Sequence, residues 1–356
     1  MNASLLLLPG DGVGPEVVAA AQHVIAAVAR AFGHSFTVTE APIGGAALRQ
    51  GGSALPAETL ALARSVDAIL LGAVGDPAFD RGDSSRRPET ALLTLRRELG
   101  LYANLRPARV WPGLEDAGPL KPAVLAGTDM LVVRELTGGL YYGEPRGQAP
   151  GEAHNTMRYS RFEVERIARV AFEAARTRRR HVTSVDKANV LETSRLWRAV
   201  VTEVVRDYPD VTLSHMYVDA CAMRIALAPS TFDVILTENL FGDILSDEAG
   251  AIVGSLGLLP SASIGDGPGL FEPVHGSAPD IAGRNVANPI GAIASAAMLL
   301  RHALRLDQEA RAVETAIERV LQAGQRTPDL VAPGRPSLGT SEMSAAIAAA
   351  IEPPSA

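Results

Sequence analysis

The sequence has little of what several classes of protein require. One cysteine, Cys221, excludes an internal disulfide and a cysteine-based zinc site, so a reducing, cytoplasmic setting is the expectation. Acidic residues outnumber basic ones by 40 to 33, and the net charge of −7 argues against general binding to nucleic acid or anionic membranes. No basic segment precedes the leucine-rich start, and the apolar run 289–300 is shorter than the ~20 residues of a membrane span. We therefore expect a soluble protein without a targeting segment.

The residues that are present indicate an α/β protein. Hydrophobic residues make up 47% of the 356, and this length suggests roughly two domains. Apolar runs typical of buried strands alternate with amphipathic helical patterns. Strands are expected at 5–8, 67–72, 130–134, 182–185, 212–218 and 234–237, and helices from Pro15 onward and at 89–99, 164–176, 192–205 and 239–253. This alternation predicts at least one largely parallel sheet. The broken, polar segment 141–155 is expected to form a hairpin or arm.

A glycine-rich turn follows the first expected strand. Gly10-Asp11-Gly12-Val13-Gly14 stands before the helix that starts near Pro15, where backbone amides could approach an anionic ligand. Its spacing is not that of the Rossmann dinucleotide fingerprint, and it lacks the lysine of a P-loop. A tight turn without a ligand explains the pattern about as well.

Carboxylates supply the stronger chemical signal. Asp243 and Asp247 are four residues apart on one expected helix, so both lie on one face. Asp219 stands at the end of the expected strand 212–218. Three carboxylates without histidine or cysteine form an oxygen-donor set that suits Mg²⁺ or Mn²⁺. Solvated surface aspartates remain the alternative.

Other candidates are scattered along the chain. Arg96, Arg106 and Arg134 come from a helix, a loop and a strand end, and together they could bind a polyanionic small molecule. Lys187 directly follows an expected strand, where α/β folds place ligand-binding residues. The loop 272–280 is long enough to wrap a cofactor. Taken singly, each arginine is more often a surface residue. The lysine is explained equally well as a solvated turn residue, and the loop can be a long connection.

Taken together, six stretches resemble the β-decarboxylating dehydrogenases, and among them the branch that acts on 3-isopropylmalate. The stretches occur in the family's order over nearly the whole chain: LLPGDGVGPEV, RPETALLTLRRELGLYANLRP, VVRELTGGLYYGEPRG, TSVDKANVLETSRLWR, TENLFGDILSDEAG and EPVHGSAPDIAG. The resemblance implies a two-domain isopropylmalate/isocitrate dehydrogenase-like fold that is not a Rossmann fold. It implies a discontinuous cofactor-binding domain, 1–101 plus 254–356, and a second domain, 102–253, with the dimer interface and a hairpin arm at about 137–157.

The same resemblance implies roles for individual residues. The general acid–base pair corresponds to Tyr141 and Lys187, and the metal carboxylates to Asp219, Asp243 and Asp247. The family is homodimeric, and Lys187 and Asp219 are expected to act across the interface. The implied substrate-binding residues are Arg96, Arg106, Arg134, Leu92, Leu93 and Asp219. The implied NAD-binding residues are Gly14, Glu89, His275, Gly276, Ser277, Ala278, Pro279, Asp280, Ile281 and Asn288.

Two features bear on specificity. Leu92 and Leu93 precede Arg96 by one helical turn and would desolvate the charged C3 substituent of isocitrate, whereas they would bury an isopropyl group. Asp280 can accept hydrogen bonds from ribose hydroxyls and would repel a 2′-phosphate, which predicts NAD.

The expected reaction is the oxidative decarboxylation of 3-isopropylmalate to 4-methyl-2-oxopentanoate, in leucine biosynthesis. Homoisocitrate, isocitrate or tartrate as substrate, or a non-catalytic anion-binding homologue, are the alternatives. Ala220, Cys221 and Arg224 depart from the family's usual residues beside Asp219.

Overall fold

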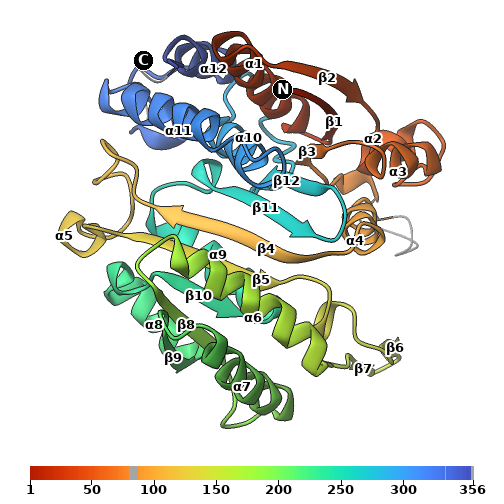
Figure 1. The fold of residues 1–356 in the computed structure, drawn as a ribbon. Helices are drawn as coiled ribbons and strands as arrows, with labels where there is room; N and C mark the ends of the chain where they lie inside the picture. The colour runs from red at the N-terminus through yellow and green to blue at the C-terminus, as the bar shows by residue number, and fades with distance from the viewer. Residues whose placement is uncertain (80–86, 333, 354–356) are drawn as a thin grey trace. The chain divides into compact units, whose positions relative to one another are not determined.

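Both ends of the chain contribute to one compact unit. The computed structural model describes residues 1–79, 87–332 and 334–353 (Figure 1). The first unit comprises Met1–Leu101, Trp111–Ala117 and Gly254–Ala356, and the second comprises Tyr102–Val110 and Gly118–Val253. Each unit has its own arrangement of strands and helices.

The strands of the first unit lie in the order β2-β1-β3-β12-β11. Pairing is parallel from β2 to β12 and antiparallel between β12 and β11. The bounds are β1 Asn2–Gly10, β2 Ser35–Glu40, β3 Ala68–Ala73, β11 Pro260–Gly265 and β12 Gly269–Pro273. All six residues of β3 are buried, as an inner strand covered on both faces requires.

Helices cover both faces of these strands. They are α1 Gly14–Phe32, α2 Gly44–Arg49, α3 Ala57–Ala63, α4 Glu89–Glu98, α10 Ile290–His302, α11 Asp307–Gln322 and α12 Thr340–Ala349. Leu6 and Leu8 pack into a core with Leu48 of α2 and Leu95 of α4. Side chains alternate along a strand, so Leu5 and Leu7 face the opposite side, where α1 and α10 lie. Figure 1 shows α1, α10, α11 and α12 as one group, and each contacts at least two of the others.

The second unit repeats the layered plan. Its strands lie in the order β4-β5-β10-β8-β9, antiparallel between β4 and β5 and parallel beyond. The bounds are β4 Leu101–Arg109, β5 Asp129–Glu135, β8 His181–Asp186, β9 Thr212–Tyr217 and β10 Val234–Thr237. The helices are α5 Pro122–Leu125, α6 Arg161–Arg176, α7 Glu192–Val204, α8 Val218–Leu227 and α9 Asn239–Ile252. A separate two-stranded hairpin, β6 Gly147–Ala149 with β7 Glu152–His154, lies within the segment where the sequence favours a hairpin or arm.

The predicted α/β class is confirmed, and the expected strand boundary beside Asp219 is wrong. The expected strand 212–218 ends at Tyr217, and Val218 and Asp219 form the first turn of α8. Asp219 is therefore a helix residue, and a carboxylate in a first helical turn is favoured by the helix dipole. The apolar run 289–300 becomes α10, whose residues are buried from Ile290 to Leu300. Among the described residues, no helix is long and apolar enough to cross a membrane.

Candidate active site

Two predicted arginines, two predicted aspartates and Tyr141 meet in the second unit. Asp243, on α9, accepts hydrogen bonds from Arg134 Nη1 and from the Tyr141 hydroxyl, the latter at 2.6 Å. Arg106 Nη1 lies 3.4 Å from Asp243 Oδ1 and 3.2 Å from Asp247 Oδ1. These side chains come from β4, β5, the turn Gly139–Tyr141 and α9, so the fold brings together what is far apart in the sequence.

The start of α9 leaves space for the Arg134 side chain. Glu238 caps the helix by accepting hydrogen bonds from the backbone amides of Leu240 and Phe241. Gly242 lies against the arginine, and a Cβ there would come within 2.6 Å of Arg134 Cγ. Because glycine leaves this space open, the buried arginine can extend along the helix to Asn239 and Asp243.

The electrostatics keep Tyr141 protonated. Burial, and then its hydrogen bond to the Asp243 carboxylate, raise the pKa of Tyr141 to about 12. The guanidinium of Arg134 lies 5.6 Å from the centre of the tyrosine ring. Burial also raises the pKa of Asp247, with the neighbouring charge of Asp243 acting in the same direction. The phenol can therefore serve as a proton donor at neutral pH.

Lys187 and Asp219 form a second group of the second unit. Lys187 Nζ lies 2.6 Å from Asp219 Oδ1, and this hydrogen bond lowers the pKa of the aspartate. The Lys187 backbone amide donates to Ser194 Oγ at 3.0 Å, which fixes the chain as it leaves β8. Asp186 next to it is held by two hydrogen bonds from Arg198, at 2.8 and 2.9 Å. The lysine is thus presented from a rigid strand end.

The three predicted metal carboxylates do not come together within one chain. Among the described residues, no group of three or more histidine, cysteine, aspartate or glutamate side chains is placed to hold a metal ion. Asp243 and Asp247 do share one cationic neighbour, because Arg106 Nη1 lies within 3.4 Å of both. The pair therefore already accommodates a positive charge between its oxygens, and hard oxygen donors suit Mg²⁺ or Mn²⁺.

In the first unit, the glycine turn contacts the expected cofactor loop. The backbone amide of Val13 donates to the carbonyl of Ser277 at 2.8 Å. Gly12 has φ +57°, and a Cβ there would lie 1.9 Å from the same carbonyl oxygen. Ser277 and Glu89 also approach Gly75, since a Cβ on that glycine would lie 3.3 Å from a side-chain oxygen of each.

Asp11 organises this turn from inside. Its buried carboxylate accepts backbone N–H groups from Gly45, Ala46 and Gly75, at 2.9, 2.7 and 2.9 Å. Three amides from two separate segments thus converge on one side chain, in the manner of a carboxylate at a helix N-terminus. Asp11 stands inside the glycine-rich motif, and nothing in the sequence pattern indicates this role.

The remaining predicted cofactor residues, apart from Gly14, lie along one loop that has no regular structure. His275 Nε2 is buried and has no hydrogen-bond partner in the described part of the chain, and burial lowers the pKa of this histidine. Asn288 donates to Asp329 at 3.0 Å and accepts from the amide of Ile290 at the start of α10. The side chain of Asp280 is exposed. The other predicted residues of the loop are Gly276, Ala278, Pro279 and Ile281, and Gly14 begins α1.

Arg96 belongs to α4 of the first unit. It is buried and lies 2.6 Å from Glu272, a partner that the sequence analysis did not identify. Leu92 packs against the hydrophobic core beneath α4, whereas Leu93 is half-buried and lies outside that core. Of the two predicted specificity leucines, Leu92 is therefore the one that packs against this core.

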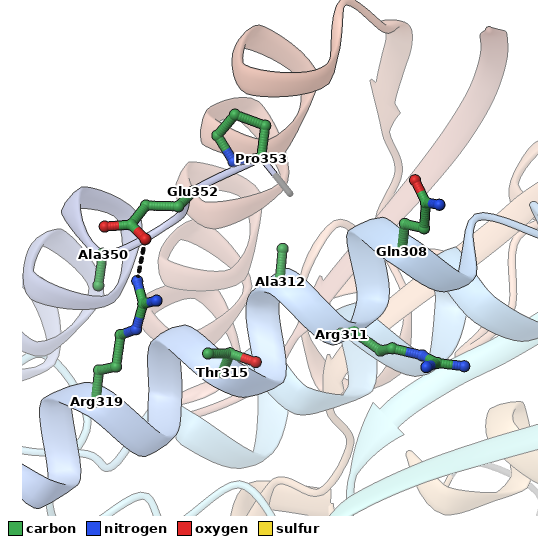
Figure 2. A pocket seen from close by; sticks show the side chains of 8 residues that line it. All are labelled: Gln308, Arg311, Ala312, Thr315, Arg319, Ala350, Glu352 and Pro353. Carbon is green, nitrogen blue, oxygen red and sulfur yellow. Dashed lines mark ion pairs between the residues drawn. The ribbon is translucent and has the colours of Figure 1, made fainter. Parts of the chain in front are cut away.

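A separate hollow in the first unit contains none of the predicted residues. A cavity of about 290 Å³ lies between α11 and residues 350–353. Figure 2 shows the side chains that line it. Its arginines are already paired, Arg319 with Glu352 and Arg311 with Asp307, each at 2.5 Å. Since these charges are neutralised locally, the hollow offers no uncompensated arginine for a ligand.

Comparisons with known proteins agree on one family. The model of the family described as isocitrate/isopropylmalate dehydrogenase matches residues 4–347. A 3-isopropylmalate dehydrogenase of Moorella thermoacetica is 57% identical over 343 residues, which are 95% of this chain and 96% of that protein. One of Gloeobacter violaceus is 56% identical and covers 98% of both chains.

Solved structures are similar over the same span. An isocitrate dehydrogenase from Methylococcus capsulatus has a TM-score of 0.87 at 38% identity, with 98% of this chain and 99% of that chain covered. A beta-decarboxylating dehydrogenase from Thermococcus kodakarensis has a TM-score of 0.81 at 39% identity, with 98% and 96% covered.

Proposed function

Because the chain belongs to the isocitrate/isopropylmalate dehydrogenase family, we propose that it oxidatively decarboxylates (2R,3S)-3-isopropylmalate to 4-methyl-2-oxopentanoate with reduction of NAD⁺, a step of leucine biosynthesis in the cytoplasm. The observation that carries this proposal is the cluster of Arg106, Arg134, Tyr141 and Asp243. Relatives at 54–57% identity that are named for this activity favour it over homoisocitrate, isocitrate or tartrate as substrate.

We assign binding and proton transfer to separate side chains. Arg96, Arg106 and Arg134 bind the substrate's carboxylates through their guanidinium groups. Lys187 accepts the proton of the C2 hydroxyl, and the protonated Tyr141 donates a proton to the carbon that has lost CO₂. Leu92 and Leu93 face the isopropyl group, and Leu93 makes the larger contribution because Leu92 is engaged in the core.

The proposed metal site uses Asp243 and Asp247 together with Asp219 of a second copy. The two α9 carboxylates already flank one cationic atom, and their oxygens suit a hard divalent ion. A bound Mg²⁺ or Mn²⁺ would supply Lewis-acid polarisation of the substrate's oxygens. Arg106 and Arg134, which pair with Asp243 here, would then be available to the substrate's carboxylates.

The proposed cofactor region is the loop 275–281 with Gly14, Glu89 and Asn288. The buried Nε2 of His275, which has no hydrogen-bond partner among the described residues, is a polar atom that a bound ligand could satisfy. The exposed carboxylate of Asp280 favours ribose hydroxyls over a 2′-phosphate, which supports NAD⁺ over NADP⁺. NAD⁺ held by these residues would supply the acceptor for the hydride that leaves C2. On this basis we propose that the first unit binds the cofactor.

We propose a homodimer in which the second unit carries the interface. Met223 and Leu227 on α8 and Ile244 on α9 are 62, 68 and 56% exposed, and the two helices contact each other. An apolar face of this kind is expected to be covered by a second copy. Lys187 and Asp219 would then act in the partner's site. Mixing inactive Lys187→Ala chains with inactive Tyr141→Phe chains should restore activity, and its absence after verified subunit exchange would refute the shared site.

The direct test of the function is NADH formation with purified chain, Mg²⁺ and D-threo-3-isopropylmalate. We expect turnover with NAD⁺, a lower kcat/KM with NADP⁺, and a clear preference over isocitrate and homoisocitrate. Turnover of isocitrate at an equal or higher kcat/KM would refute the substrate assignment. Binding of isopropylmalate without turnover would indicate the non-catalytic homologue.

A further inference from the structure

A buried amide links Arg134 to the backbone that leads to Tyr141. Asn239, fully buried at the start of α9, accepts hydrogen bonds through Oδ1 from Arg134 Nη2 at 2.7 Å and from Arg134 Nε at 3.2 Å. Its Nδ2 donates to the carbonyl of Gly138 at 3.1 Å. The reversed amide would set its NH₂ against the guanidinium and its oxygen against the carbonyl, so the orientation is determined by its partners.

Both backbone polar groups of Gly138 form hydrogen bonds to side chains. While Asn239 binds the carbonyl, the amide of Gly138 donates to buried Glu135 at 2.8 Å. The next residue, Gly139, begins the turn that ends at Tyr141. The loop that presents Tyr141 is therefore attached to the same side chain that orients Arg134.

Tyr159 sets Asn239 in place. Its buried hydroxyl accepts the backbone amide of Asn239 at 3.0 Å and donates to Glu238 Oε2 at 3.2 Å. Its ring also fills the space beside the loop glycines, because a Cβ on Gly138 would lie 2.7 Å from Tyr159 Cε1. One phenol thus packs against the loop and bonds the helix that carries Asn239.

We propose that Asn239, held by Tyr159, is a positioning residue that couples the geometry of Arg134 to that of Tyr141. This inference rests on the proposed function, in which Arg134 binds substrate and Tyr141 donates a proton. A helix-capping role does not explain it, because Glu238 already accepts the first amides of α9. Asn239 fixes two of the guanidinium nitrogens of Arg134. The third nitrogen, Nη1, is therefore directed at Asp243, where the arginine joins the cluster.

The kinetic test compares Asn239→Ala and Tyr159→Phe with a matched control. Tyr208→Phe also removes one tyrosine hydroxyl from a buried ring of the second unit, stacked 5.0 Å from Phe172 and outside the cluster. Hydrogen bonds to a charged group predict a loss of about 10- to 100-fold in kcat/KM for Asn239→Ala, with a raised KM for isopropylmalate. Tyr159→Phe should lose about 2- to 10-fold, and Tyr208→Phe should leave kcat and KM unchanged.

Hydrogen exchange gives a readout that needs no turnover. The amides of residues 138–143 should exchange faster in Asn239→Ala and Tyr159→Phe than in the wild-type chain, whereas Tyr208→Phe should not change them. An inactive wild-type chain would overturn the proposed function and leave this comparison intact. If Asn239→Ala and Tyr159→Phe lower only the melting temperature, with wild-type KM, kcat and exchange of this loop, Asn239 has a purely structural role and the inference is wrong.

Discussion

Replacing Gly12 with alanine tests the contact between the glycine turn and the loop 275–281. The backbone of Gly12 has φ +57°, in the left-handed region, and an added Cβ would lie 1.9 Å from the Ser277 carbonyl oxygen and 2.6 Å from its carbon. Backbone atoms cannot rotate away as a flexible side chain can. The alanine can therefore be accepted only if the two segments separate, which breaks the 2.8 Å hydrogen bond from Val13.

The cost of the left-handed conformation and the cost of the broken hydrogen bond can be measured separately with other glycines of the same unit. A left-handed conformation costs an alanine about 1–2 kcal/mol. Loss of the Val13–Ser277 hydrogen bond adds about 0.5–1.5 kcal/mol. Gly283 has φ +75° with open space around it, so alanine there should cost the conformational part alone. Gly276 also has open space and no left-handed backbone, so alanine there should change stability by less than about 0.5 kcal/mol.

Urea denaturation of the three variants, without cofactor, measures these differences from the shift of the midpoint. We expect the order of destabilisation Gly12→Ala, then Gly283→Ala, then Gly276→Ala. Gly12→Ala should also raise the KM for NAD⁺, because the loop 275–281 is displaced. Equal losses for Gly12→Ala and Gly283→Ala would refute the steric argument.

Three further predictions follow from the second unit and α4. Asp243→Asn should lower Mg²⁺-dependent turnover by about 100-fold or more with an unchanged circular dichroism spectrum, because a charged ligand is lost; undiminished activity would remove Asp243 from the site. Burial raises the pKa of Cys221 to about 12, so a thiol reagent should modify it only after denaturant is added; rapid modification of the native chain would contradict this burial. Leu93→Ala should lower kcat/KM for isopropylmalate more than for malate, at about 0.8 kcal/mol per methylene no longer buried, and equal losses would make the leucine structural.

The elements that could be predicted are those with a strong local pattern. The inner parallel strands, such as β3 and β10, are continuous apolar runs, and α9 has a regular amphipathic period. The antiparallel strand β4 was missed because Arg106 and Pro107 interrupt its apolar pattern. The end of β9 was misplaced because Val218 suits a strand as well as the helix that it begins.

The family resemblance names the residues expected at the site, and it does not give their geometry. That Asp243 meets both Arg134 and Tyr141 depends on pairings of β5 with α9 and of α9 with the turn at 139–141, which no local pattern encodes. Glu272, Asn239 and Tyr159 were missed because their partners lie far along the chain. A sequence signal for Glu272 and Asn239 was present, because both lie inside stretches that resemble the family.

The discontinuous first unit also has a consequence for synthesis on the ribosome. Its strand β3 pairs with β12, and α1 packs against α10 and α12, so Met1–Leu101 cannot complete their core until residues near 349 have been translated. The second unit lies wholly within residues 102–253, so its chain is complete earlier in translation. Domains usually fold in order from the N-terminus as they emerge from the ribosome. In this chain the second unit can fold before the first. The nascent N-terminal third therefore remains without its partner strand and helices for most of translation.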